Sequence, residues 1–146
     1  MTAEPLTLRV LLLRPGARVP TRATEASTGF DLYARLDSDL ELSDSPTLVP
    51  TGIAIEAPAG SDIQVRPRSG LARLGVLSTF GTLDTDYRGE VQVTMYTVNP
   101  GIRYTVHDGD RIAQLVVGTH VPARFRVARR LSETARGDRG HGSTGR

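Results

Sequence analysis

The sequence has 146 residues, of which 38% are hydrophobic and 23% charged, and its formal net charge is +2. This length is typical of one domain with a core of its own. The absence of cysteine excludes disulfides, zinc bound by cysteine and cysteine nucleophiles. All 18 basic residues are arginine, which excludes lysine Schiff bases and the lysine-dependent Walker A loop. So small a net charge gives no reason to expect a nucleic-acid partner.

The N-terminal pattern gives no sign of a membrane or secretory segment. No apolar run reaches 18 residues, and Leu11–Leu13 is too short for the core of a signal peptide. We therefore expect a cytoplasmic protein that makes no membrane contact.

In chain order, the sequence predicts short strands separated by turns. The strand patterns lie at 6–13, 30–34, 47–55, 62–66, 77–80, 91–97, 103–106 and 112–117. Turns rich in Gly, Pro and Asp recur about every ten residues, which is typical of an all-β sandwich or barrel. Only residues 67–75 could form a helix, and they would form one of about two turns. A β domain of this size has sheet edges that closure, oligomerisation or strand exchange would cover.

The end of the chain changes in composition. Residues 132–146 are mainly Gly, Ser, Thr, Arg and Asp and contain no aromatic residue, so they cannot build a core. We predict a β domain over residues 1–131 and a flexible C-terminal arm over residues 132–146.

Residues 81–90, Gly-Thr-Leu-Asp-Thr-Asp-Tyr-Arg-Gly-Glu, place polar groups between two strand patterns. We expect them to form the bend of a hairpin, with Gly81 and Gly89 tolerating φ > 0. Such a bend is often only a solvated turn. The alternative is that it carries chemistry, with Asp84 as a base.

Three further polar clusters interrupt the strands. Asp31, in Thr-Gly-Phe-Asp-Leu, either caps a turn or binds a metal ion or its waters. Ser69, in Arg-Ser-Gly-Leu-Ala, either caps a short helix or belongs to an anion site. Gln114, in Gly-Asp-Arg-Ile-Ala-Gln-Leu, either simply faces outward from a strand or contributes to a site.

The fifth cluster lies in the tail, at residues 136–145. Its composition predicts a disordered linker. Its Gly-Ser-Thr-Gly end also offers the backbone donors, hydroxyls and close approach that a phosphate group needs. Arg136 and Arg139 could add bidentate contacts, and His141 could stack on a ring. A tail that orders on a ligand would act as a lid.

Several enzyme classes are excluded. The chain has neither the His-x-Glu with Pro-Cys-x-x-Cys of zinc nucleobase deaminases nor a Gly-x-Ser-x-Gly nucleophile elbow. His107 and His120 lack metal-ligand spacing. A base, phosphate-binding elements and a carboxylate for Mg²⁺ remain, which fits attack by activated water on a phosphate ester or anhydride.

The five clusters, in this order and spacing, resemble the five motifs of the homotrimeric dUTPases (deoxyuridine triphosphate nucleotidohydrolases) from about Val19 to Gly145. The resemblance implies a jelly-roll-like β fold with at most one short helix, and a homotrimer. Each active site would combine motifs from all three subunits, with the C-terminal arm arriving from a neighbour. The implied reaction converts dUTP and water to dUMP and pyrophosphate, with Mg²⁺ on the triphosphate. This would limit uracil in DNA and supply dUMP for dTMP synthesis.

The resemblance also implies roles for single residues. Asp84 would activate the water that attacks the α-phosphorus, Tyr87 would exclude a 2′-hydroxyl, and Asp31 would steady Mg²⁺ through its waters. The backbone near Thr82, Leu83 and Gln92 would read uracil. The phosphates would be bound by Arg68, Ser69, Gly70, Gln114, Arg136, Gly142, Ser143 and Thr144.

Two positions depart from the family pattern. His141 stands where the family usually has the Phe that stacks on uracil, and imidazole is smaller and titrates near pH 6.5. Ser78 stands where many bacterial members have an Asn that positions uracil, directly or through water. Asp86 has no role that the sequence reveals.

Two alternatives to dUTP hydrolysis remain open. The first is the sister enzyme that deaminates dCTP, which shares the fold and the Pro-Arg-Ser motif; the terminal Gly-Ser-Thr-Gly arm argues against it. The second is a non-catalytic nucleotide-binding trimer, against which the intact Asp84 argues.

Overall fold

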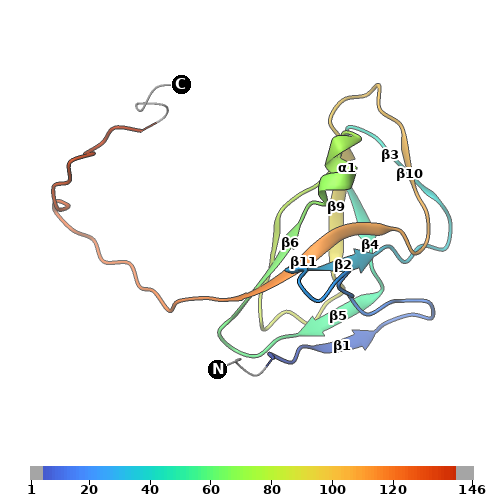
Figure 1. The fold of residues 1–146 in the computed structure, drawn as a ribbon, viewed down its shortest axis with the longest axis horizontal. Helices are drawn as coiled ribbons and strands as arrows, with labels where there is room; N and C mark the ends of the chain where they lie inside the picture. The colour runs from blue at the N-terminus through green and yellow to red at the C-terminus, as the bar shows by residue number, and fades with distance from the viewer. Residues whose placement is uncertain (1–4, 141–146) are drawn as a thin grey trace.

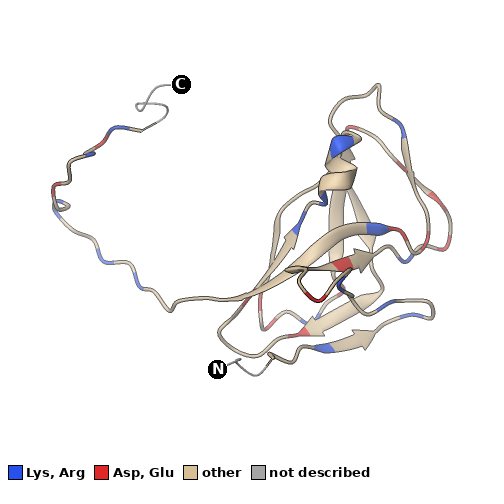
Figure 2. Ribbon diagram, in the orientation of Figure 1, with Lys and Arg blue, Asp and Glu red and all other residues tan. Residues whose placement is uncertain are grey.

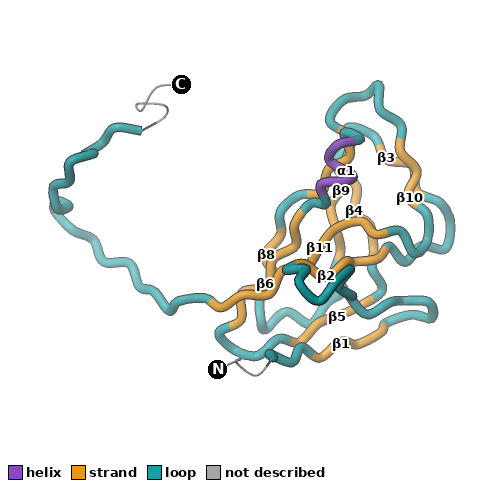
Figure 3. The backbone as a smooth tube through the Cα atoms, in the orientation of Figure 1, coloured by secondary structure: helices purple, strands orange, loops and turns teal. Residues whose placement is uncertain are grey.

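The computed structural model describes residues 5–140. Within them the chain forms eleven strands and one short helix (Figures 1 and 3). The strands are β1 Arg9–Leu12, β2 Gly29–Tyr33, β3 Leu40–Leu42, β4 Thr47–Pro50, β5 Ile53–Glu56, β6 Ser61–Arg66, β7 Val76–Ser78, β8 Gly81–Leu83, β9 Gln92–Thr97, β10 Tyr104–Val106 and β11 Arg111–Thr119, and the helix is α1 Ser69–Arg73. The predicted all-β architecture with one short helix is confirmed.

The strands form two larger sheets and two strand pairs, and every pairing is antiparallel. One sheet has the order β2-β11-β6-β8 and the other β4-β9-β7, while β1 pairs with β5 and β10 with β3. The apolar faces of these sheets enclose one core, which includes Leu32, Ile63, Val93, Met95 and Ile112. The layered arrangement is that of a jelly-roll-like fold.

Period-two patterning accounts for the longer strands. In β6, Ser61, Ile63 and Val65 are buried, whereas the side chains between them are half-buried. In β9, Val93, Met95 and Thr97 are buried in the same alternating way. Alternation of this kind fixes strand register, because a slip by one residue would turn the apolar set outward.

The single strand predicted over 47–55 is wrong, because the chain turns within it. β4 joins the sheet with β9, and β5 pairs with β1 instead. Gly52 lies between them with φ +71°. A Cβ atom there would also lie 2.9 Å from the Cβ of Ala17, so the turn requires glycine.

The hairpin predicted around residues 81–90 is also wrong in its pairing. β8 pairs with β6 and β9 pairs with β4 and β7, so the two arms of the bend belong to different sheets. Neither Gly81 nor Gly89 is among the glycines with positive φ. The segment 84–91 therefore bridges two sheets that separate, instead of closing a tight turn.

The chain leaves the body of the molecule after β11, and Figure 1 shows an extended segment there that leads into the C-terminal arm. Residues 121–127 form no strand, and Val121, Phe125 and Val127 are 86%, 104% and 100% exposed. Several arginines of the arm are visible as blue segments in Figure 2. In the described part of the chain, no helix is long and apolar enough to cross a membrane.

Candidate active site

A polar cavity of about 360 Å³ brings three of the predicted clusters together. Its walls come from the segment before β2, from β2 itself, from the start of α1 and from β11. The predicted site residues that line it are Asp31, Arg68, Ser69, Gly70 and Gln114. The structure therefore brings together, with Asp31, the residues before the arm that were expected to bind phosphates.

Asp31 lies between two arginines in this polar cavity. Its Oδ1 is 3.1 Å from Nε of Arg68, and its Oδ2 is 3.5 Å from Nη1 of Arg111. Arg68 also donates from Nη1 to the backbone oxygen of Arg111 at 3.0 Å. Figure 2 shows the acidic position in β2 beside the basic end of β11. One carboxylate thus orients two guanidinium groups and leaves one net positive charge, which suits an anion.

Arg111 is a residue of this cavity for which the sequence patterns predicted no role. The sequence signal was available, because Gly-Asp-Arg-Ile-Ala-Gln-Leu contains Arg111 three residues before Gln114. What sequence patterns could not supply was the antiparallel pairing of β11 with β2, which brings Arg111 and Gln114 beside Asp31.

Gln114 is held across the cavity by a neighbouring loop and packs against a glycine. Its Nε2 donates to the backbone oxygen of Pro67 at 2.9 Å. A Cβ atom on Gly29 would lie only 2.1 Å from Oε1 of Gln114. Gly29 therefore provides the space that the Gln114 amide occupies.

This contact leads to a testable prediction for Gly29→Ala. The added methyl group should push the Gln114 amide aside and lower kcat/KM for the substrate by about tenfold, within the range that overpacking costs. Steady-state kinetics would measure it. The matched control is Gly118→Ala on β11, where a Cβ would make only ordinary contacts at 3.8 Å. Equal effects of the two substitutions would contradict the steric role of Gly29.

The helix that follows Arg68 differs from the sequence interpretation. Arg68, in an extended conformation, holds the N-cap position without a side-chain capping bond, and Ser69 is the first helical residue. The interpretation of Ser69 as N-cap is therefore wrong. The helix is only five residues long, so its dipole is too small to make an anion site, and phosphate binding would rest on the side chains around it.

A second cavity, of about 280 Å³, opens where β8 and β9 separate. Thr82, Leu83, Tyr87 and Gln92 line it, as do Val91 and Thr94. The backbone edges of two strands that do not pair with each other therefore face this space. It brings together the residues predicted to read the base and the sugar.

Tyr87 is fixed at this second cavity by its own loop. Its hydroxyl donates to the backbone oxygen of Glu90 at 3.1 Å, and its backbone N–H donates to the oxygen of Asp84 at 3.0 Å. A Cβ atom on Gly89 would lie 2.2 Å from the tyrosine hydroxyl. Gly89 is therefore needed for space and not for positive φ.

Asp84 lines a third cavity, of about 570 Å³, together with Thr82, Leu83, Asp86 and His120. Thr82 and Leu83 line the second cavity as well, so Asp84 is adjacent to the pocket predicted to bind the nucleobase. The cavity holding Arg68 and Gln114 shares no lining residue with either of these. Within one chain, Asp84, the predicted general base, and the predicted phosphate ligands therefore line separate cavities.

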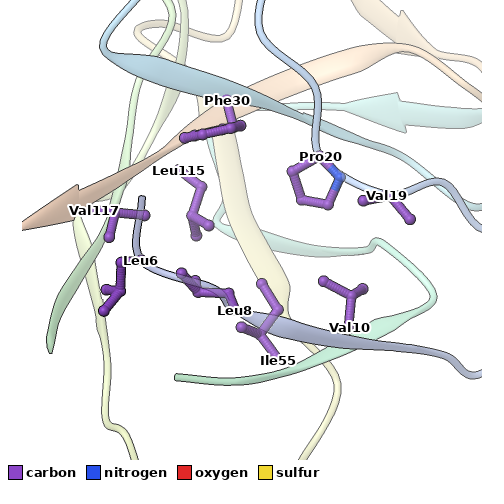
Figure 4. Close-up of a pocket in the computed structure, with 9 residues that line it drawn as sticks. All are labelled: Leu6, Leu8, Val10, Val19, Pro20, Phe30, Ile55, Leu115 and Val117. Carbon is purple, nitrogen blue, oxygen red and sulfur yellow. The ribbon is translucent and has the colours of Figure 1, made fainter. Parts of the chain in front are cut away.

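The largely apolar cavity in Figure 4 offers no chemistry. It has a volume of about 180 Å³ and is lined by apolar residues of β1, β2, β5 and β11 and of the segments beside them. Leu8, Phe30 and Leu115 are examples of these residues, and none of the lining residues that the structure describes has an ionisable side chain.

Two predicted site residues lie elsewhere. Ser78 is buried in β7, and its Oγ has no hydrogen-bond partner among the described residues; it does not line the second cavity. Arg136 is in the extended arm, where it exchanges hydrogen bonds with Arg139. His141, Gly142, Ser143 and Thr144 lie outside the described residues.

The chain is similar to known proteins over most of its length. The family model for dUTPase matches residues 16–145. A deoxyuridine 5'-triphosphate nucleotidohydrolase of Maricaulis maris is 41% identical over 152 aligned positions, which cover 99% of each chain. The enzyme of the same name from Desulfotalea psychrophila is 46% identical over 132 positions, which cover 87% of each chain.

Solved structures show the same fold. A dUTPase of Staphylococcus bacteriophage 80alpha with dUpNHpp superimposes with a TM-score of 0.83 at 22% identity, covering 95% of this chain and 98% of that one. A dUTPase from phage phi11 of S. aureus, described with a structural Mg(II) ion, gives a TM-score of 0.77 at 20% identity over 85% of this chain and 97% of its own. The family model and the sequence identities extend over nearly the whole chain, and this protein therefore belongs to the dUTPase family.

Proposed function

We propose that this protein is a dUTP diphosphatase, which hydrolyses dUTP to dUMP and pyrophosphate. The observation that carries the proposal is the cavity between β8 and β9, with Asp84 in the adjoining cavity and Tyr87 fixed at its wall. In a member of the dUTPase family, this arrangement supports a pocket for a base and a sugar beside a carboxylate that can activate water.

The proposed reaction is a single displacement at phosphorus. Asp84 accepts a proton from water as the water oxygen bonds to the α-phosphorus. The bond from that phosphorus to the oxygen bridging to the β-phosphate breaks, and pyrophosphate leaves with that oxygen. Asp84 is exposed in the single chain, so water has access to it.

Selection of the nucleoside would depend on the second cavity. The backbone of Thr82 and Leu83, with Gln92 opposite, offers donors and acceptors that can match uracil and mismatch cytosine. The tyrosine ring of Tyr87 would pack against the deoxyribose and leave no room for a 2′-hydroxyl. We retain Ser78 in this role only as a prediction, because the structure gives it no contact with the cavity.

The phosphates would be bound by the polar cavity around Asp31. Arg68, Ser69 and Gln114 would contact their oxygens, and the pairing of Asp31 with Arg68 and Arg111 would hold the guanidinium groups in place. Arginine is suited to this task, because its planar donors match phosphate oxygens. The C-terminal arm would add Arg136, Gly142, Ser143 and Thr144 around the γ-phosphate, with His141 over the uracil ring.

Mg²⁺ fits this chain best as part of the substrate. The described residues contain no group of three or more acidic or histidine side chains placed to hold a metal ion. Mg²⁺ is commonly bound through substrate phosphates, water and one or two carboxylates. We propose that it arrives with the triphosphate, neutralises part of its charge, and meets Asp31 through water.

We further propose that the enzyme is a homotrimer with sites shared between subunits. The separation of Asp84 from Arg68 and Gln114 within one chain supports this, because each half-site lacks the groups that the other supplies. The exposed apolar side chains of Val121, Phe125 and Val127, in the segment between β11 and the arm, also need a surface to cover them. A neighbouring subunit would supply that surface and receive residues 132–146 over its site.

The direct test of the function is to incubate the purified protein with Mg²⁺ and either dUTP or dCTP. Pyrophosphate release from dUTP, without ammonia release from dCTP, is the expected result. Ammonia from dCTP would indicate the deaminase, and binding of dUTP without turnover would indicate a non-catalytic trimer. Because the proposed substrate belongs to the cellular deoxynucleotide pool, we propose a cytoplasmic enzyme that limits uracil in DNA and supplies dUMP for dTMP synthesis.

A further inference from the structure

The carboxylate of Glu90 connects three segments that are distant in sequence. Its Oε1 accepts from the backbone N–H of Gly52 at 2.7 Å and from Nη2 of Arg14 at 3.1 Å. The Glu90 side chain is 24% exposed and that of Arg14 33% exposed, so both bonds are partly shielded from water. Partly shielded, charge-assisted bonds of this kind are stronger than those between exposed side chains.

The Gly52 anchor is itself rigid. Its positive φ and the close approach of Ala17 and Arg35 require glycine there, and its backbone oxygen accepts from the N–H of Leu13 at 2.8 Å. The residues that follow Glu90 and Gly52 are also joined, because the backbone N–H of Val91 donates to the backbone oxygen of Ile53 at 2.8 Å. Glu90 is therefore tied to a fixed part of the fold on both its side chain and its following residue.

Glu90 also accepts a hydrogen bond from the hydroxyl of Tyr87. The acceptor is the backbone oxygen of Glu90, at 3.1 Å, and Gly89 leaves space for the ring. Glu90 and Tyr87 both line the cavity between β8 and β9. Any movement of the Glu90 backbone would move the tyrosine ring at the wall of that cavity.

We propose that Glu90 is a positioning residue for nucleoside selection, which holds Tyr87 in place through its bonds to Gly52 and Arg14. The role of Tyr87 in excluding a 2′-hydroxyl rests on the proposed function. Glu90 itself does not discriminate between sugars. Its side-chain bonds fix the position of its own backbone oxygen, to which the hydroxyl of Tyr87 donates. Loss of the side-chain oxygen that accepts from Gly52 therefore loosens the ring, and UTP gains access relative to dUTP.

The test compares kcat/KM for dUTP and UTP in wild type, Glu90→Ala and Glu90→Gln, well below the Tm of each protein. In Glu90→Ala the ratio of the two values should fall about tenfold, since small misplacements of positioning groups have effects of this order or larger. Its kcat for dUTP should change by less than about threefold, because Asp84 is untouched. Glu90→Gln keeps an oxygen acceptor for Gly52 and should retain most of the selectivity.

The matched control is Glu56→Ala, which removes another partly exposed acid that contacts the same loop, 3.8 Å from Nη2 of Arg88. Its selectivity should equal that of wild type. A folded Glu90→Ala protein with wild-type selectivity and only a lower Tm would overturn the positioning role, as would an equal loss in the control. If wild type itself releases no pyrophosphate from dUTP, the proposed function fails instead.

Discussion

Replacing Asp84 by asparagine is expected to lower kcat for dUTP by about 10³-fold, the middle of the range that general bases contribute. Asparagine keeps the size of the side chain but accepts no proton, so the attacking water would no longer be activated. Asp84 is exposed and lines an open cavity, so the substitution should leave Tm and dUTP affinity nearly unchanged. Pyrophosphate release and calorimetric binding of dUTP would measure the two effects separately.

The control for this prediction is Asp62→Asn, which removes another carboxylate that lines the same cavity. Asp62 accepts a hydrogen bond from Nε2 of Gln64 at 2.6 Å and has no role in the proposed reaction. Its variant should keep most of the wild-type kcat. An Asp84→Asn enzyme with near wild-type turnover would show that another group acts as the base.

Removal of residues 132–146 is expected to have an effect of similar size on activity. The arm would supply several phosphate contacts and a lid, and the loss of a single donor of this kind commonly costs about 10² to 10³ in kcat. We therefore expect kcat/KM to fall by at least about 100-fold. Tm should change little, because residues 132–139 are exposed and belong to no strand or helix.

Calorimetry and steady-state kinetics on the truncated enzyme would test both parts of this prediction. Arg136→Ala should reproduce part of the loss of activity. Arg103→Ala, which removes a guanidinium whose side chain is 77% exposed beside β10, should not. A large drop in Tm with unchanged turnover would mean that the arm contributes to folding and not to catalysis.

Local patterns predicted the elements whose faces differ clearly in polarity. The alternation of Ile63 and Val65 with Asp62 and Gln64 indicated β6, and that of Val93 and Met95 indicated β9. In each case one face of the strand is buried, so apolar and polar residues alternate along it. This alternation can be recognised from a few consecutive residues. The short helix near Ser69 was expected on a different ground, the Leu, Ala and Arg content of residues 67–75.

Sheet membership was not predictable in this way, since it depends on partners that are distant in sequence. Nothing local to 47–55 reveals that β4 and β5 pair with different strands, although Gly52 marks the turn. The same holds for β8 and β9, whose separation creates the cavity beside Tyr87. Strand pairing is stabilised by contacts between side chains of adjacent strands. The sequence pattern of one strand therefore does not identify the strand with which it pairs.

The resemblance to the dUTPases identified the motif residues, and the structure added the residues that support them. Arg111 shares the carboxylate of Asp31, Gly29 makes space for Gln114, and Glu90 holds the oxygen to which Tyr87 donates. Each of these roles is a contact between segments more than two residues apart. The sequence can contain these residues in a motif, as it does Arg111, but it does not show which side chains they contact.

In the proposed trimer, the half-site with Asp84 and the half-site with Arg68 act together only between subunits. The most direct measurement is dUTP hydrolysis by trimers containing equal amounts of Asp84→Asn and Arg68→Ala chains, each nearly inactive alone. Random mixing leaves both groups intact in about a quarter of the shared sites, so activity should recover to about a quarter of wild type. Mixed trimers no more active than either parent would contradict shared sites and place the whole reaction within one chain.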